Sequence, residues 1–262
     1  MANANQTVHL FAEALPVAIS DQGSGRIFLI LHGGAGPASV SGLADALADN
    51  GRAIVPTHPG FAGQPQPEWF HRVDDLALAY LALLERVDAR DVVLVGNSFG
   101  GWIAAEMALR HSPRVAGLVL LCAAGIDTGP GGRPIVNPGT LPPADRAAFA
   151  FHNAKQFAVV PSTEEGLAMM VANQKAMLSY SGEAFMHDPT LRARLAGIAI
   201  PSMVIWGESD RIIDVEYGRR YAESIPGARF EVVEEAGHFP HIEKLERVLS
   251  LMGDLPDARR AP

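Results

Sequence analysis

The chain has little of several features that define other protein classes. It contains 1 cysteine, Cys122, in 262 residues, so an internal disulfide is excluded, and with it a secreted fold held by disulfides. No stretch approaches the roughly 18 continuous apolar residues of a membrane span. Met1 to Glu13 carries neither a positively charged start nor a long apolar segment. We therefore expect no signal peptide, no membrane association and a cytoplasmic location.

Clusters of positive charge are also lacking. Lysine and arginine total 21 against 29 aspartates and glutamates, the formal net charge is −8, and no basic run occurs. Without such a run there is no electrostatic footprint for nucleic acid or an anionic membrane, and we expect neither as a partner. The sequence leaves open whether two copies of the chain form a homodimer. With 48% hydrophobic residues, the chain can bury one large core, or a core with a sizeable insertion.

Apolar runs of strand length alternate with helical patterns over most of the chain. Such alternation indicates right-handed βαβ crossovers and therefore an α/β fold with a mainly parallel sheet. The expected strands lie at 27–31, 53–55, 92–95, 115–121, 203–206 and 230–233, and the expected helices near 76–87, 100–110, 217–224 and 242–252.

The alternation breaks between about 125 and 197. Residues 129–143 are rich in glycine and proline, and helical patterns follow without strand-like runs between them. Ser162, with Glu165 three residues on, predicts a helix start by the capping-box pattern. The chain is therefore divided into a first core part, 1–125, a helical lid, 126–197, and a second core part, 198–262.

The stretch Gly96-Asn97-Ser98-Phe99-Gly100-Gly101 joins an expected strand to an expected helix. It is the Gly-x-Ser-x-Gly pattern in the strand, turn and helix setting that this pattern requires. A strand that reverses into a helix over about five residues strains the backbone of the central residue and leaves its neighbours no space for a Cβ. The pattern predicts that Ser98 stands out at the edge of the sheet as a nucleophile.

A serine hydroxyl needs a base that accepts its proton and an acid that orients the base. In the second half of the chain, Asp210 and His238 each follow a strand-like run. Because the carboxyl ends of parallel strands share one edge of a sheet, these side chains can meet Ser98 there. We predict Ser98, Asp210 and His238 as the catalytic residues, with Glu208 as the alternative acid and Asp214 also close by.

A glycine-rich loop at 32–36 follows the first buried strand, so its backbone N–H groups can face a ligand. Fixed N–H donors stabilise the oxyanion of acyl transfer. We predict the N–H groups of Phe99 and Gly34 in this role, with Gly33 or Ala35 as alternatives to Gly34. Neither nucleotide-binding glycine motif occurs at this junction, so we expect no nucleotide, and the chemistry requires no cofactor and no metal.

Phenylalanine and methionine are frequent in the expected lid, which predicts an apolar substrate pocket. Flexible methionines suit several ester side chains better than a single one, so the first expectation is a small or medium carboxylic ester. An acidic ring-fission product would instead need an arginine, and Arg133, Arg192 and Arg194 are the candidates. The predicted pocket residues are Phe149, Phe157, Met170, Met177 and Phe239.

Five motifs follow one another along the chain: His32-Gly33-Gly34, Pro59-Gly60-Phe61, Gly96 to Gly101, Trp206 to Asp210 and Ala236-Gly237-His238. Together they resemble the motifs of the α/β-hydrolase family, and the resemblance covers nearly the whole chain. It implies an eight-stranded, mostly parallel sheet with one antiparallel strand near its start and a helical lid after the sixth strand. It also implies a serine nucleophile at 98, a base at 238 and an acid at 210, whereas epoxide hydrolases and haloalkane dehalogenases place an aspartate at the nucleophile position.

The resemblance leaves the reaction open between two chemistries. Asn97 before the nucleophile, with the His-Gly-Gly loop, is similar to carbon–carbon bond hydrolases that cleave ring-fission products of aromatic compounds, but Phe239 stands where that branch often has tryptophan. We therefore expect a carboxylesterase-like serine hydrolase acting through an acyl-enzyme, with hydrolysis of a vinylogous diketone, a meta-cleavage product, as the alternative. A non-catalytic ligand receptor on the same fold is a further hypothesis, although a receptor has no need of the complete catalytic set.

Overall fold

The computed structural model describes residues 4–129, 131–159, 161–182 and 184–256. Its centre is an 8-stranded sheet with the order β1-β2-β4-β3-β5-β6-β9-β10. In this sheet β2 is antiparallel to both of its neighbours, and every pair from β4 to β10 is parallel. The expected mostly parallel sheet with one antiparallel strand is therefore confirmed. The strands are β1 (Ala4–Leu10), β2 (Leu15–Gly23), β3 (Arg26–Leu31), β4 (Gly51–Pro56), β5 (Val92–Asn97), β6 (Val115–Leu121), β9 (Ser202–Gly207) and β10 (Arg229–Val233).

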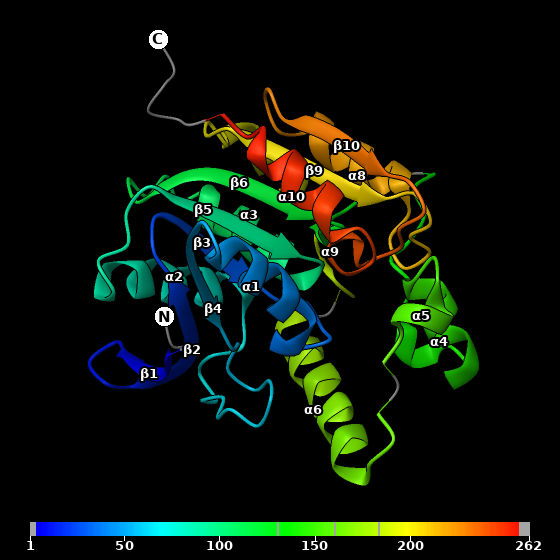
Figure 1. The fold of residues 1–262 in the computed structure, drawn as a ribbon, viewed down its shortest axis with the longest axis horizontal. Helices are drawn as coiled ribbons and strands as arrows, with labels where there is room; N and C mark the ends of the chain where they lie inside the picture. The colour runs from blue at the N-terminus through cyan, green and yellow to red at the C-terminus, as the bar shows by residue number, and fades with distance from the viewer. Residues whose placement is uncertain (1–3, 130, 160, 183, 257–262) are drawn as a thin grey trace.

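Helices cover both faces of the sheet (Figure 1), which explains why the central strands are apolar throughout. Successive residues of a strand point to opposite faces, so Leu29 of β3 packs in the core shared with α2, α3 and α8, whereas Ile30 packs in the core shared with α1 and α10. The sheet thus has two hydrophobic cores. The helices around them are α1 (Ser41–Ala48), α2 (Val73–Arg86), α3 (Phe99–Ala108), α8 (Val215–Glu223), α9 (Pro240–Glu243) and α10 (Leu245–Gly253), with the short helix η1 (Pro37–Val40).

The segment between β6 and β9 contains most of the remaining helices. Figure 1 shows α4, α5 and α6 standing beyond one end of the sheet. The sequence predicts helices alone here, but a short pair of strands, β7 (Gly125–Ile126) and β8 (His187–Asp188), joins the two ends of the segment. Each of these strands has two paired residues, which are too few to show a periodic pattern in the sequence. The helices are η2 (Pro138–Thr140), α4 (Pro143–Ala150), α5 (Ala154–Phe157), α6 (Glu164–Ser181), α7 (Leu191–Arg194) and η3 (Leu195–Gly197).

Two helix boundaries differ from the expected ones. Thr163, not Ser162, caps α6: its backbone is extended and its hydroxyl accepts a hydrogen bond from Gly166 N–H at 3.1 Å. The final helix is interrupted at Lys244, whose φ of −139° and ψ of 53° lie outside the helical region, so that α9 packs on α1 and α10 on β10. In the part of the chain that the structure describes, no helix is long and apolar enough to span a membrane.

A buried carboxylate ties α3 to the segment that precedes β9. The Glu106 side chain on α3 is 3% exposed, and its oxygens pair with Arg194 of α7 at 2.6 Å and with Arg110 at 3.0 Å. Arg194 also pairs with Asp188 of β8 at 2.7 Å. The charge on Glu106 is therefore compensated on both oxygens, which a buried carboxylate requires.

Replacing Glu106 by glutamine tests this network. The amide keeps the shape but removes the charge that two arginines share, so we expect the free energy of unfolding to fall by roughly 3–5 kcal/mol. Urea denaturation of the wild type and the variant measures the loss. An unchanged denaturation midpoint would show that the network contributes nothing to stability.

Candidate active site

Ser98 occupies a strained turn at the carboxyl end of β5. Its φ of 54° and ψ of −117° lie in a region that residues other than glycine rarely adopt. The turn is possible because a Cβ at Gly96 would overlap the carbonyl of Gly100, and a Cβ at Gly100 would overlap that of Leu31. Ser98 itself is 8% exposed and directly precedes α3. The predicted strand, turn and helix arrangement is therefore present.

Asp210 and His238 form a buried hydrogen-bonded pair. His238 Nδ1 lies 2.8 Å from Asp210 Oδ2, and the two side chains are 6% and 0% exposed. The other carboxylate oxygen, Oδ1, accepts the N–H groups of Ile212 and Ile213, both at 2.9 Å. With Oδ1 held by the backbone, Oδ2 is directed at the imidazole ring.

The two other acids near this loop have different partners. Glu208 is exposed, and its carboxylate accepts the N–H of Glu235 at 3.3 Å. Asp214 caps α8 by accepting the N–H of Tyr217 at 2.9 Å. Of the candidate acids, Asp210 is therefore the one that the structure places against His238.

The backbone of His238 is tied to the residue before Ser98. Asn97 Nδ2 donates a hydrogen bond to His238 O at 3.2 Å and another to Leu121 O at 3.1 Å. Because β5, β6, β9 and β10 run parallel, Ser98, Asp210 and His238 follow strands that end at the same edge of the sheet. Residues more than a hundred positions apart in the sequence thus share one site.

The glycine loop after β3 lies beside Ser98. A Cβ built on Gly33 would be 3.0 Å from Ser98 Cβ, so this backbone approaches the serine closely. Among the described residues, the N–H groups of Gly34 and Phe99 donate no hydrogen bond. The N–H of Phe99 is the first of α3, where intrahelical partners are lacking. Both predicted oxyanion donors are therefore without a hydrogen-bond acceptor among the described residues.

Helix α6 covers the outer side of this glycine loop. The Met177 sulfur packs so closely that a Cβ on Gly34 would lie 2.5 Å from it. Asn173, which the sequence does not single out, is buried; its Oδ1 accepts the N–H of Ala62 at 2.8 Å and its Nδ2 contacts Ala35 O at 3.5 Å. A lone asparagine in a helical pattern carries no signal of such a contact.

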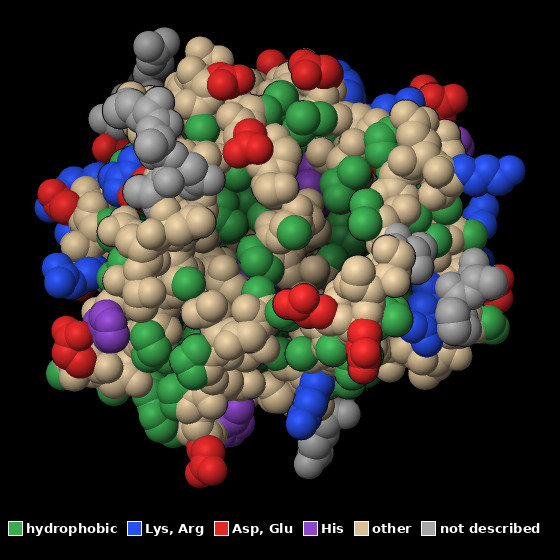
Figure 2. Space-filling model, turned by 60° about the horizontal axis from the view of Figure 1, so that its bottom comes forward, with side chains coloured by type: hydrophobic (Ala, Val, Ile, Leu, Met, Phe, Trp, Pro, Cys, Tyr) green, Lys and Arg blue, Asp and Glu red, His purple; other side chains and the backbone are tan. Residues whose placement is uncertain are grey.

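The remaining predicted pocket residues occupy varied environments. Phe239 follows His238, with 5.2 Å between the two ring centres, and stacks on Phe151 at 5.1 Å. Phe149 and Phe157 are half-buried, and Met170 on α6 is 40% exposed. Figure 2 shows hydrophobic side chains gathered around a hollow on the face that lies at the bottom of Figure 1.

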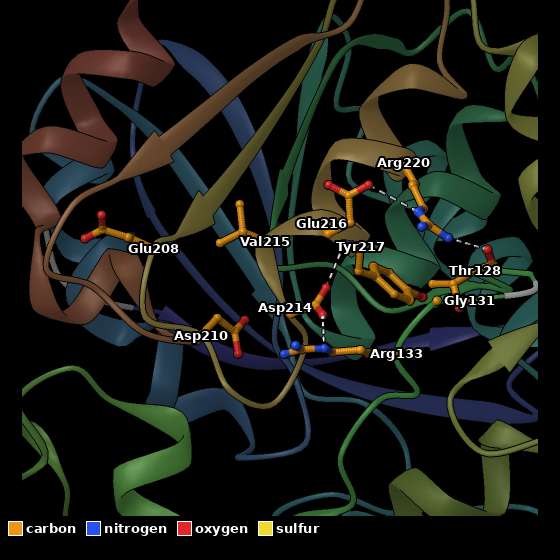
Figure 3. A pocket seen from close by; sticks show the side chains of 11 residues that line it. Thr128, Gly131, Arg133, Glu208, Asp210, Asp214, Val215, Glu216, Tyr217 and Arg220 are labelled. Atoms are coloured by element: carbon orange, nitrogen blue, oxygen red, sulfur yellow. Dashed lines mark hydrogen bonds and ion pairs between the residues drawn. The ribbon is translucent and has the colours of Figure 1, made fainter.

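A polar cleft of about 490 Å³ opens next to the loop that follows β9 and carries Asp210. Figure 3 shows Arg133 directed at Asp214 and Arg220 at Glu216, so the cations in the cleft are already paired. None of the predicted pocket residues lines this cleft. Its lining is Thr128, Gly131, Gly132, Arg133, Glu208, Asp210, Asp214, Val215, Glu216, Tyr217 and Arg220.

The described residues include one group of three side chains whose potential metal-ligating atoms lie within 4.8 Å of one another: Cys122, Asp210 and His238. Burial raises the pKa of the Cys122 thiol well above its usual value. Asp210 Oδ2 and His238 Nδ1 are joined by the 2.8 Å hydrogen bond, and the Cys122 sulfur accepts the N–H of Gly207 at 3.5 Å. The three side chains are therefore a hydrogen-bonded carboxylate and imidazole beside a buried thiol.

Two further histidines form a buried layer under the glycine loop. His32 Nε2 accepts the N–H of His58 at 3.1 Å, and the His58 ring contacts the Tyr80 hydroxyl at 2.5 Å and His32 O at 2.9 Å. Burial lowers the pKa of His32 to about 4. Burial, followed by the proximity of His32, lowers the pKa of His58 well below its usual value. Both rings are therefore neutral supports for the loop.

A model of the α/β-hydrolase family matches residues 28–251. The chain belongs to this family. It is similar to a 2-hydroxymuconate semialdehyde hydrolase of Pseudomonas putida, with 27% identity over 89% of this chain and 88% of that protein. A 2-hydroxy-6-oxononadienedioate/2-hydroxy-6-oxononatrienedioate hydrolase of Paraburkholderia phymatum is 29% identical over 92% and 90%. The solved meta-cleavage product hydrolase of Pseudomonas fluorescens IP01 shares the fold, with a TM-score of 0.75 and 23% identity over 94% and 95% of the chains.

The buried histidines predict how stability depends on pH. Burial lowers the pKa of both His32 and His241 to about 4, below the value of about 6.5 in the unfolded chain. Between these pH values the unfolded state binds more protons than the folded state. The contribution of the two rings to the free energy of unfolding is therefore complete above pH 6.5 and is lost as the pH falls toward 4. Each ring accounts for about 3 kcal/mol of that loss.

Urea midpoints measured from pH 7 to pH 4 test the expectation. His241→Gln keeps a donor toward Ser39 O. The variant should reduce the slope of the unfolding free energy against pH by an amount that corresponds to at most one bound proton. A decline that is equally steep in the variant would contradict the assignment for His241.

Proposed function

We propose that the protein is a serine hydrolase in which Ser98 attacks a carbonyl carbon, His238 transfers the proton and Asp210 orients His238. The observation that carries the proposal is the buried 2.8 Å hydrogen bond between Asp210 and His238, held at the same sheet edge as the strained turn of Ser98. Asp210 fixes the tautomer with the proton on Nδ1, which leaves Nε2 to accept a proton from the serine.

The oxyanion formed by the attack is bound by the N–H groups of Phe99 and Gly34. These donors are in place before the reaction, and each is worth roughly 3 kcal/mol of transition-state stabilisation. The start of α3 adds the positive end of its helix dipole. The strained turn places Ser98 directly before the first N–H of α3.

The substrate class is a vinylogous diketone whose carbon–carbon bond is hydrolysed. Support comes from the relatives at 27% and 29% identity, which are named as hydrolases of 2-hydroxymuconate semialdehyde and of 2-hydroxy-6-oxononadienedioate. This was the alternative expectation from the sequence, and it replaces the carboxylic ester as the first choice.

Hydrolysis of this bond follows from the same groups. The Ser98 oxygen bonds to the carbonyl carbon while His238 takes the serine proton. The carbon–carbon bond then breaks, its electron pair passes to a carbon that the conjugated ketone stabilises, and His238 returns the proton to that carbon. Water, deprotonated by His238, releases the carboxylic acid from Ser98, so the net reaction adds one water across the bond.

A small carboxylic ester is the second candidate substrate. An acidic ring-fission product needs a cation in the pocket, yet Arg194 is paired with Glu106 and Asp188, and Arg192 contacts Thr128 O and Ser224. Arg133 is paired with Asp214 in the polar cleft. These engagements favour a neutral substrate, which an ester satisfies.

Residues 126–197 act as a lid in this proposal, because α6 covers the glycine loop and the chain ends of the segment are joined by β7 and β8. Residues 130, 160 and 183 of this range lie outside the described residues. The core parts flank the lid at 1–125 and 198–262, of which the structure describes 4–125 and 198–256.

Ser98→Ala tests the nucleophile. It should abolish turnover and labelling by a fluorophosphonate probe while the melting temperature stays close to that of the wild type. Turnover at the wild-type rate would remove Ser98 from its role. A wild type that is neither labelled nor active on any substrate below would favour the receptor hypothesis.

A panel of a dienoate ring-fission product, short p-nitrophenyl esters and lactones separates the substrate classes. We expect the highest kcat/KM for the dienoate, followed through the loss of its absorbance. If the esters exceed it by a factor of about ten, or roughly 1.4 kcal/mol in the transition state, the ester assignment takes its place.

Met177→Ala tests the size of the pocket. Removing the side chain that packs on Gly34 should raise the kcat/KM ratio of longer to shorter acyl esters by about tenfold, because one methylene in such a pocket is worth about 1–3 kcal/mol. Met177→Leu, which keeps the volume, is the matched control. An unchanged ratio in the alanine variant would place Met177 outside the pocket.

A further inference from the structure

Glu243, on α9, is a buried carboxylate held by backbone N–H groups. It is 8% exposed, and its Oε2 accepts Gly237 N–H at 2.6 Å and His152 N–H at 3.1 Å, while Oε1 accepts Asn153 N–H at 2.8 Å. Among the described residues, no lysine or arginine makes an ion pair with it. Its charge is therefore compensated by hydrogen bonds, which makes those bonds strong and expensive to lose.

These hydrogen bonds join two parts of the chain that are far apart in sequence. Gly237 immediately precedes His238, and residues 152 and 153 connect α4 to α5. The same region is joined a second time, because His238 N–H donates to Ala150 O at 2.7 Å. Gly237 permits this approach, since a Cβ there would overlap the carbonyl of Ala150.

The end of α4 also contacts the loop that carries Asp210. Arg211 N–H donates to Phe149 O at 3.2 Å, and the His152 ring contacts the Ser209 hydroxyl at 2.8 Å. Residues 148–153 are therefore bound to the loops of both Asp210 and His238. The insertion meets the site twice: α6 over the glycine loop, and this segment against the acid and base loops.

We propose that Glu243 is a positioning residue that couples residues 148–153 to the imidazole of His238. The inference rests on the proposed function, because its consequence for the rate passes through His238 as the base. The carboxylate holds the Gly237 peptide on one side and the 152–153 turn on the other, so movement of the turn moves the backbone of His238. Glu243 touches no substrate.

Glu243→Gln removes the charge and replaces one acceptor oxygen by an amide NH2 group. At least one of the backbone N–H groups then faces another donor, and the clamp loosens. A displacement of about 1 Å at a reacting group costs up to 100-fold in rate, so we expect kcat to fall about 10-fold or more. KM should change less than twofold, because the pocket on α6 is untouched.

The control is Glu106→Gln, which removes another buried carboxylate, one that binds α7 instead of the His238 loop. Both variants should lose stability, but the slower kcat and slower fluorophosphonate labelling should occur in Glu243→Gln alone. Glu243→Asp keeps the charge on a shorter side chain and should recover part of the rate. If Glu243→Gln fails to fold, kcat and the labelling rate of Glu243→Asp are compared with those of Glu106→Gln instead.

Hydrogen exchange supplies a measurement independent of catalysis. In the variants at 243, exchange should rise together at residues 148–153 and at 236–239, and in Glu106→Gln at neither segment. Exchange that rises in only one segment, or labelling at the wild-type rate in Glu243→Gln, would overturn the proposal. If the wild type is not labelled, the role of Ser98 fails, and the joint exchange response still decides whether the clamp exists.

Discussion

The site depends on the close approach of backbone segments at the carboxyl end of β5. Ser98 holds a positive φ in a turn where β5, α3 and the end of β3 approach one another closely. This approach requires glycine at 96 and 100, because a Cβ at either position would overlap neighbouring backbone. That contact fixes three items of geometry together: the serine, the first N–H of α3 and the glycine loop after β3. The strain is carried by a sheet with a hydrophobic core on each face, which is stiff enough to sustain it.

Two buried carboxylates beside this turn, those of Asp210 and Glu243, are oriented by backbone N–H groups. Asp210 has one oxygen saturated by two N–H groups and offers the other to His238. Glu243 is held by three N–H groups. Backbone donors cannot rotate away as arginine and lysine side chains can, so they orient a carboxylate at little further cost in conformational entropy.

The segment between β6 and β9 is attached to the site by two different contacts. The side chains of Met177 and Asn173 on α6 pack against the glycine loop. Residues 148–153 are instead hydrogen-bonded to the loops of Asp210 and His238. Separate parts of one insertion thus contact the glycine loop and the loops of Asp210 and His238. The solved meta-cleavage product hydrolase and this chain share the fold, and a shared fold does not by itself fix the substrate.

Local patterns were enough to predict the fold class, which the sheet and the family match confirm. The same patterns singled out Ser98, Asp210 and His238: an apolar run, a glycine with a steric reason, and a polar residue where the run ends. An interruption of these patterns predicted the insertion at 126–197. Contacts in three dimensions were needed to distinguish Asp210 from Glu208, to pair Arg194 with Glu106 and Asp188 and Arg133 with Asp214, and to reveal Asn173 and Glu243. Most of these contacts join residues between 27 and 111 positions apart and follow no helical or strand period, so no spacing in the sequence could report them.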